Sequence, residues 1–154
     1  VKTMPEDKYH VVWRVKYEPG TIKAVSRKDG KVVVEKEIHT AGEPAQIRLT
    51  ADRTEIQADG TDLSFITVEI VDKDGNLCPN ADNLVNFDVQ GAAFIAGVDN
   101  GSQTSMERFK DNHRKAFYGK CLVLLQSDGK SGKATLTATA NGLNNAELAL
   151  TFNF

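Results

Sequence analysis

Hydrophobic and polar residues alternate one by one along most of this chain, and a period of two indicates half-buried β-strands. Each run places its apolar residues on one face and its charged or hydroxyl-bearing residues on the other. The clearest runs span residues 11–17, 45–51, 66–70, 85–89, 134–140 and 146–152. No segment keeps a helical period, and at most residues 105–112 would form a short turn of helix. We therefore predict an all-β protein.

Turn signals separate these runs. Asp29-Gly30 and Asp74-Gly75-Asn76 are typical of hairpins, because glycine and asparagine accept positive φ angles. Short strands that recur about every 8–12 residues are typical of two packed antiparallel sheets. The sequence therefore predicts an immunoglobulin-like antiparallel β-sandwich.

A domain boundary is predicted near residues 40–44. Residues 43–154 have the length of one immunoglobulin-like sandwich. Residues 1–42 hold about three candidate strands, too few to cover both faces of a sandwich, and we interpret them as the C-terminal strands of a preceding β-domain. Their apolar face would pack on the main sandwich or pair with another chain through an open edge, as in a homodimer. The three candidate strands are residues 9–17, 21–27 and 31–39.

Charge and hydropathy exclude several classes of partner. The 19 Lys and Arg residues are interspersed with 21 Asp and Glu residues, so no basic stripe for nucleic acid is present. No apolar run approaches the ~20 residues that cross a membrane. The chain begins at Val1 without a visible signal peptide, and we interpret it as part of a longer protein.

Two groups of residues resemble known chemistry but do not complete it. Asp72, Asp74 and Asn76 have the spacing of a calcium loop, yet the positions that need Gly and Glu hold Leu77 and Asn83. A solvent-facing hairpin turn explains them better. The carboxylates within residues 52–62 are interpreted as polar surface residues of two paired strands. The three histidines are scattered along the sequence and form no motif. The sequence predicts no metal and no cofactor.

The two cysteines leave one question open. Cys121 lies in the apolar run Cys-Leu-Val-Leu-Leu and reads as a small core residue. Cys78 precedes Pro79 near a turn. A disulfide would form in an oxidising compartment only if the two Cα atoms lie within bonding range, which spacing alone does not decide.

A long polar excursion interrupts the strands between residues 97 and 113. Long ordered loops in compact domains are uncommon and often functional. Most of the larger aromatic residues, Phe65, Phe94 and Phe117 among them, are assigned to the core. Phe109 and Tyr118 are the exceptions, which in exposed positions would stack on a sugar ring. The candidate binding or interdomain residues are Asp99, Asn100, Glu107, Phe109, Arg114 and Tyr118.

Two stretches resemble a known family. The first contains Tyr17-x-Pro19-Gly20-x-Ile22-x-Ala24 and the exit Thr40-Ala41-Gly42; the second runs from residue 47 to 152. Its matching pieces are Asp52-Arg53, Ala58-Asp59-Gly60, Asp72-Lys73-Asp74-Gly75 and residues 79–87, 97–101 and 114–123. Together they resemble the C-terminal immunoglobulin-like region of bacterial family 2 glycoside hydrolases of the β-galactosidase type. The final domain of those enzymes is related in fold to invasin-type repeats.

The resemblance implies a parent that hydrolyses terminal β-galactosides by a retaining, two-glutamate mechanism. None of the catalytic positions has a counterpart in this chain, so it is expected to be a non-catalytic accessory module whose partners are other domains of the parent. Two alternatives stay open: a carbohydrate-binding module and a surface adhesin-type repeat. We expect the parent to be periplasmic or secreted.

Overall fold

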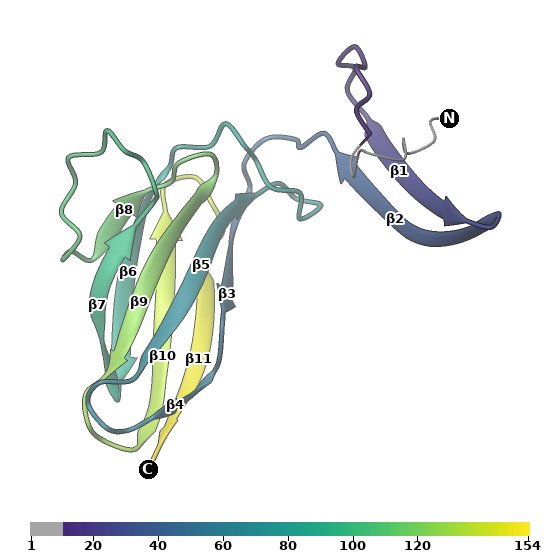
Figure 1. Cartoon of the computed structure of the whole chain (residues 1–154). Coiled ribbons are helices and arrows are strands. Elements are labelled where there is room, and N and C mark those ends of the chain that lie inside the picture. Colours follow the sequence, from purple (N-terminus) through teal and green to yellow (C-terminus); the bar gives the residue numbers. More distant parts are fainter. Residues whose placement is uncertain (1–10) are drawn as a thin grey trace. The chain divides into compact units, whose positions relative to one another are not determined.

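The computed structural model describes residues 11–154 and shows eleven strands and no helix among them (Figure 1). The all-β prediction is confirmed. Residues 105–112, where a turn of helix was conceivable, contain bends only. The chain divides into two compact units, Val1–Thr40 and Ala41–Phe154, and each is described by itself.

The first unit contains a two-stranded antiparallel hairpin of β1 (Thr21–Lys28) and β2 (Lys31–His39). Asp29 and Gly30 form its turn with φ angles of 50° and 76°, as a two-residue hairpin turn requires. The predicted strand at residues 11–17 is wrong: these residues carry no strand, and residues 9–10 lie outside the described part. Alternation marks a face that can be buried, but it does not by itself make a segment a strand.

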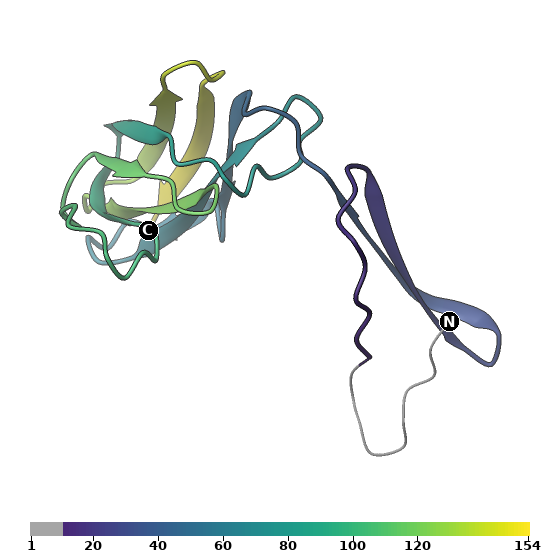
Figure 2. The same ribbon diagram turned by 90° about the horizontal axis from the view of Figure 1, so that it is seen from above.

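The second unit is an immunoglobulin-like β-sandwich of two sheets that pack face to face (Figures 1 and 2). One sheet has the order β4-β11-β10-β6-β8 and the other the order β3-β5-β9-β7. All neighbours are antiparallel except β4 and β11, which are parallel. The strands are β3 (Gln46–Ala51), β4 (Glu55–Gln57), β5 (Leu63–Val71), β6 (Leu84–Gly91), β7 (Ala93–Asp99), β8 (His113–Lys115), β9 (Lys120–Ser127), β10 (Gly132–Ala140) and β11 (Ala146–Asn153).

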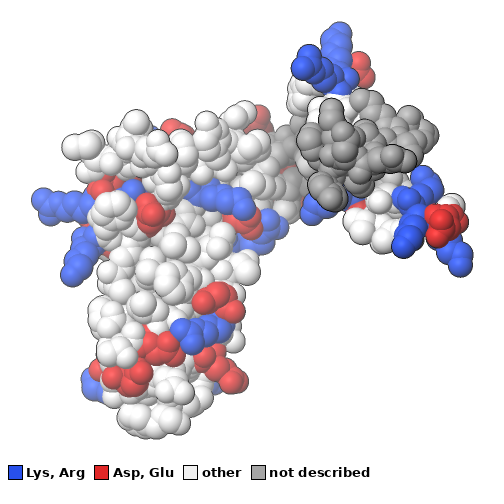
Figure 3. Space-filling model, viewed as in Figure 1, with Lys and Arg blue, Asp and Glu red and all other residues white. Residues whose placement is uncertain are grey.

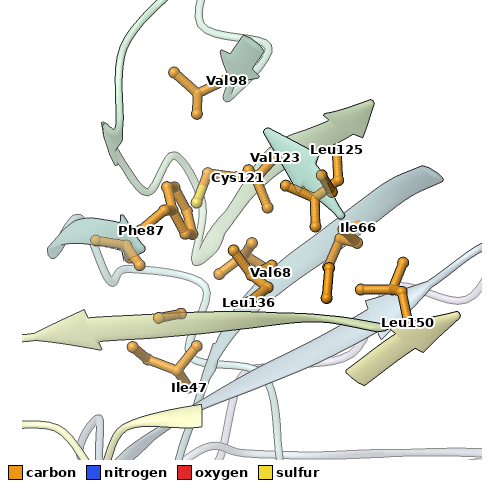
Figure 4. Close-up of a cluster of buried hydrophobic side chains, with 14 of the residues drawn as sticks. Ile47, Ile66, Val68, Phe87, Val98, Cys121, Val123, Leu125, Leu136 and Leu150 are labelled. Atoms are coloured by element: carbon orange, nitrogen blue, oxygen red, sulfur yellow. The ribbon is translucent and has the colours of Figure 1, made fainter. Parts of the chain in front are cut away.

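The core lies between the two sheets and is built from alternate residues of each strand (Figure 4). The predicted inward residues of β5 and β10 are buried, which confirms the assigned phase. Each large apolar side chain buried in this way contributes about 1.5–3 kcal/mol. Fully buried members include Ile66, Val68, Ile70, Val123, Leu125, Leu136, Leu150 and Phe152.

The turn after β5 fixes the entry of the chain into the sandwich. Asp72 Oδ2 accepts a hydrogen bond from the Gly42 amide at 2.8 Å, and Oδ1 accepts from the amides of Asp74 and Asn76 at 2.9 and 2.8 Å. The Gly42 amide, with further bonds from Asn76 and Asp74, lowers the pKa of Asp72 to about 2. The turn is as predicted, but Asp72 is buried rather than solvent-facing, because its carboxylate accepts bonds from the chain on both sides.

The two cysteines do not form a disulfide. Cys78 and Cys121 are both buried free thiols. Burial raises the pKa of Cys121 to about 12, so its thiolate is strongly disfavoured inside the sandwich. Cys121 is therefore a core residue, as its apolar run indicated.

Candidate functional site

The long loop between β7 and β8 is organised around one buried cation, Arg114. β8 is only three residues long and pairs with β6, with Arg114 opposite Val85. Strand alternation therefore turns the Arg114 side chain inward, where it is 1% exposed. A fully buried guanidinium is stable only if the protein supplies acceptors for it.

The loop supplies those acceptors from its start, at residues 99–100, and from its middle, at residues 107–108. Arg114 Nη1 donates to the backbone oxygens of Glu107 at 3.2 Å and Arg108 at 3.4 Å. Nη2 donates to Asp99 Oδ1 at 3.4 Å and to Asn100 Oδ1 at 3.3 Å. The donors of a guanidinium form a rigid, planar fork. One cation can therefore join the start of the loop to its middle.

Two further contacts complete the surroundings of Arg114. The ring of Phe109 lies 5.2 Å from the guanidinium carbon, within the range of a cation–π contact. Nε is buried without a hydrogen-bond partner and lies 3.7 Å from Glu107 Oε2. The loop therefore encloses the cation with one aromatic ring, two carboxylates, an amide and two carbonyls.

The other predicted loop residues hold the backbone in place. Asn100 Nδ2 donates to the Lys115 carbonyl at 2.9 Å, and Glu107 Oε1 accepts from the Lys115 amide at 3.0 Å. Asp99 Oδ1 accepts from the Asn100 amide at 2.7 Å, and Glu107 Oε2 accepts from Ser105 Oγ at 3.1 Å. Asp99, Asn100 and Glu107 thus direct polar atoms at their own loop.

Five of the six sequence-predicted residues come together here, and Tyr118 lies apart. Tyr118 is in the turn between β8 and β9, with a φ angle of 50° and its ring centroid 4.4 Å from that of Phe117. Phe109 and Tyr118 are 64% and 68% exposed and are available to a partner. The burial of Arg114 corrects its assignment as a contact residue, since its guanidinium faces the loop and not solvent.

Sequence reasoning missed a shallow groove beside β7. It has a volume of about 350 Å³. Its lining residues are Phe94, Ile95, Ala96, Lys110, Asp111 and Asn112. Phe65, Phe94 and Phe117 were predicted to be core but are 42%, 45% and 39% exposed. Phe65 is out of phase with its buried neighbour Ile66, and that signal was present in the sequence.

Two kinds of site are not found in the described residues. Across residues 11–154, no group of three His, Cys, Asp or Glu side chains is placed to hold a metal ion. The same residues include no helix that is long and apolar enough to cross a membrane.

Comparison with solved structures defines the class of the protein. The D0-D1 domain of intimin matches with a TM-score of 0.51 and 27% identity, covering 68% of this chain and 47% of that one. A glycosyl hydrolase family 2 member from Bacteroides cellulosilyticus matches with a TM-score of 0.85 and 42% identity, covering 92% of this chain and 18% of that one. The chain is thus an immunoglobulin-like sandwich of the kind that occurs inside larger glycoside hydrolases.

The family follows from the sequence. The model of the glycoside hydrolase family 2 C-terminal domain 5 matches residues 47–149, and the chain belongs to this family. A second model, a domain of unknown function, matches residues 1–34. The chain is 66% identical over 150 residues to the β-galactosidase BoGH2A of Bacteroides ovatus, which covers 97% of this chain. It spans only 18% of the length of that relative.

Proposed function

We propose that this chain is a non-catalytic accessory module of a family 2 glycoside hydrolase of the β-galactosidase type, with a structural, interdomain role. The observation that carries the proposal is the 66% identity to a β-galactosidase, of whose length the matched part makes up only 18%. A relative of this identity supports a shared fold, and most of that relative lies outside the matched part.

The geometry of the loop supports a structural role. Its carboxylates accept hydrogen bonds from the Asn100 amide of the loop, from the Lys115 amide of β8 and from Arg114. The groove beside β7 carries one carboxylate, Asp111, whereas a retaining glycosidase needs two about 5 Å apart. The two loop carboxylates, Asp99 and Glu107, are both engaged with Arg114, which suits a structural role better than acid–base catalysis.

The first unit supports the same proposal. An isolated two-stranded hairpin is marginally stable in water. Val32, Val33 and Val34 are consecutive, so they face both sides of β2, and they are 50–60% exposed. We propose that this unit is the last part of a preceding β-domain of the parent enzyme. We further propose a periplasmic or secreted parent, which fractionation of the source cells tests.

The test compares three purified proteins with a chromogenic β-galactoside. The parent enzyme should hydrolyse it, and the 154-residue chain should not. A parent shortened to end before residue 43 should keep its active site but unfold at a lower temperature or turn over more slowly. Hydrolysis by the chain alone, or a shortened parent with unchanged stability and activity, would refute the proposal.

Carbohydrate binding is the second candidate function, favoured by one observation. Phe109 and Tyr118 are exposed aromatic rings, the kind of side chain that lines ligand sites. The positive φ angle of Tyr118 belongs to a two-residue hairpin turn with Gly119, between the paired residues Phe117 and Lys120, and this turn projects the Tyr118 ring. Calorimetric titration of the chain with β-galactoside oligosaccharides tests it: saturable binding that Phe109→Ala or Tyr118→Ala abolishes would establish it, and no heat of binding would exclude it for those sugars.

A further inference from the structure

The outward face of the sheet β3-β5-β9-β7 is apolar at its centre. A strand with one solvated face alternates in polarity, yet β9 contains an uninterrupted apolar run. Cys121, Val123 and Leu125 point into the core and are buried. Leu122 and Leu124 lie between them on the other side of the strand and are only half-buried. The sequence of β9 is therefore that of a strand covered on both faces.

The neighbouring strands extend this surface. Phe65 of β5 is directly opposite Leu124 of β9 and is 42% exposed. Phe94 of β7 faces outward on the other side of β9 and is 45% exposed. Because opposite side chains in a sheet are about 4.5–5.5 Å apart, Phe65 and Leu124 form one continuous surface. We call Phe65, Phe94, Leu122 and Leu124 the apolar patch.

The second sheet provides an internal comparison. The outward residues of β10 are Thr135, Thr137 and Thr139, and those of the adjacent β6 include Asn86 and Asp88. Apart from Leu84 at the start of β6, which is 44% exposed, these outward residues are polar and suited to water. The two outward faces of one sandwich therefore differ in character, and only the face of β3-β5-β9-β7 resembles a surface that is removed from solvent.

Charged residues border the apolar patch. Glu69 bridges Arg48 at 2.8 Å and Lys120 at 2.9 Å across three strands of the same sheet. In Figure 3, which views this face, charged side chains gather above and below the middle of the sheet and leave the middle uncharged. An apolar centre with a charged rim is the arrangement of a protein–protein interface.

The chemistry of the patch favours a protein partner over a sugar. Saccharide recognition needs several polar groups that converge on the ligand around an aromatic ring. Gln126, the amide opposite Phe94, already donates to the Gly60 carbonyl at 2.8 Å. The other members of the patch, Phe65, Leu122 and Leu124, are apolar. The groove of about 350 Å³ beside Phe94 has polar groups on one side, Lys110, Asp111 and Asn112, so a sugar at this edge is an outcome that the test has to separate from docking.

We propose that the apolar patch is the docking surface for another folded domain of the parent glycoside hydrolase, an inference that rests on the proposed function. The partner presents an apolar surface to the patch and charges to the Arg48–Glu69–Lys120 rim. The chain spans 18% of its β-galactosidase relative and 18% of the solved family 2 structure, so the remaining polypeptide supplies such a partner on the same chain.

Side-chain footprinting tests the proposal directly. Hydroxyl radicals oxidise exposed phenylalanine rings, and mass spectrometry locates the products. In the 154-residue chain Phe65 and Phe94 should be modified readily, and in the full-length parent their rates should fall severalfold. Phe87 and Phe152, which are buried in the sandwich, should stay slow in both proteins and serve as references. Equal rates for Phe65 and Phe94 in the two proteins would overturn the proposal.

A pair of double variants supplies a second test. Phe65→Thr with Leu124→Thr makes the patch polar, and Thr135→Ala with Thr137→Ala is the matched control on the opposite sheet. The first pair should lower the melting temperature of the parent while leaving that of the 154-residue chain almost unchanged, and the control should alter neither. An equal loss in both proteins would mean that the patch stabilises only its own sandwich, which refutes docking.

Other occupants give different results. A chain that dimerises through Phe65 and Leu124, with Phe65 and Phe94 still reactive in the parent, would assign the patch to self-association. Saturable binding of a β-galactoside that Phe94→Ala abolishes would assign it to a sugar. The proposed function fails separately: a parent that loses neither stability nor activity when residues 43–154 are removed refutes the accessory role itself.

Discussion

Replacing Arg114 by methionine keeps an unbranched apolar stem and removes the guanidinium. Four hydrogen bonds of 3.2–3.4 Å, of which the one to Asp99 is also an ion pair, are lost together with the ion pair to Glu107 and one cation–π contact. A hydrogen bond to a charged group contributes about 1.5–3 kcal/mol. The contributions do not add here, because the bonds are long, Asp99 is 45% exposed and water replaces part of what is lost.

Removal of the buried charge also relieves its desolvation, which offsets a further part of the loss. We therefore expect Arg114→Met to lower the free energy of unfolding by about 2 kcal/mol. The sandwich has about 114 residues, so its melting temperature should fall by roughly 8 °C. The amides of Asn100 and Lys115, which the loop protects through Asp99 and Glu107, should exchange faster with deuterium.

Calorimetry and hydrogen exchange on the 154-residue chain measure both effects. Lys115→Met is the matched control, because Lys115 is the next residue but pairs with Asp82 at an exposed site. An exposed ion pair contributes less than about 1 kcal/mol, so the control should melt within a few degrees of the wild type. If Arg114→Met melted as the control does and kept its loop amides protected, Arg114 would not be the organiser of the loop.

Three further predictions concern the rest of the sandwich. Gly119→Ala should lower the free energy of unfolding, measured in urea, by more than about 2 kcal/mol, because φ is 75° and the new Cβ would lie 2.3 Å from the Cys78 carbonyl oxygen. Its control is Gly142→Ala, which has the same φ but open space around the new Cβ and should lose only about 1 kcal/mol. Folding lowers the pKa of Asp72 from 3.8 to about 2, so its contribution is complete above about pH 3.8 and lost as the pH falls through about 2. Acid unfolding of Asp72→Asn should lack this dependence, and an unchanged acid profile would contradict it. Cys121, with a pKa of about 12, should resist a thiol reagent near neutral pH until urea unfolds the chain.

Strand alternation predicted the inward residues of the sandwich because a two-residue period is a property of the extended backbone itself. Ile66 and Leu136 fall on the predicted inward phase and are fully buried. The same rule failed at residues 11–17, which carry no strand, because alternation specifies the face a segment could bury and not whether the segment becomes a strand. Alternation also implied that Phe65 faces outward. We nevertheless assigned Phe65 to the core because aromatic residues are generally buried, and that assignment is wrong.

The interior of the long loop was beyond sequence reasoning. Residues 97–113 were recognised as an excursion, and five of the six candidate residues do converge on it. The burial of Arg114 depends on the pairing of a three-residue strand with β6, a partner distant in the chain. Local pattern gives no information about such a pairing, so a residue chosen as a surface contact proved to be the centre of the loop.

The position of β11 has a consequence for synthesis of the protein. The last strand of the sandwich is not at an edge: it lies between β4, with which it runs parallel, and β10. Neither of these strands reaches the other, so the five-stranded sheet stays divided until β11 arrives (Figure 1). A ribosome therefore has to release Phe152, a fully buried residue, before the sandwich can close. Until then the nascent domain exposes unpaired strand edges and an open core, the features that make folding intermediates prone to aggregation.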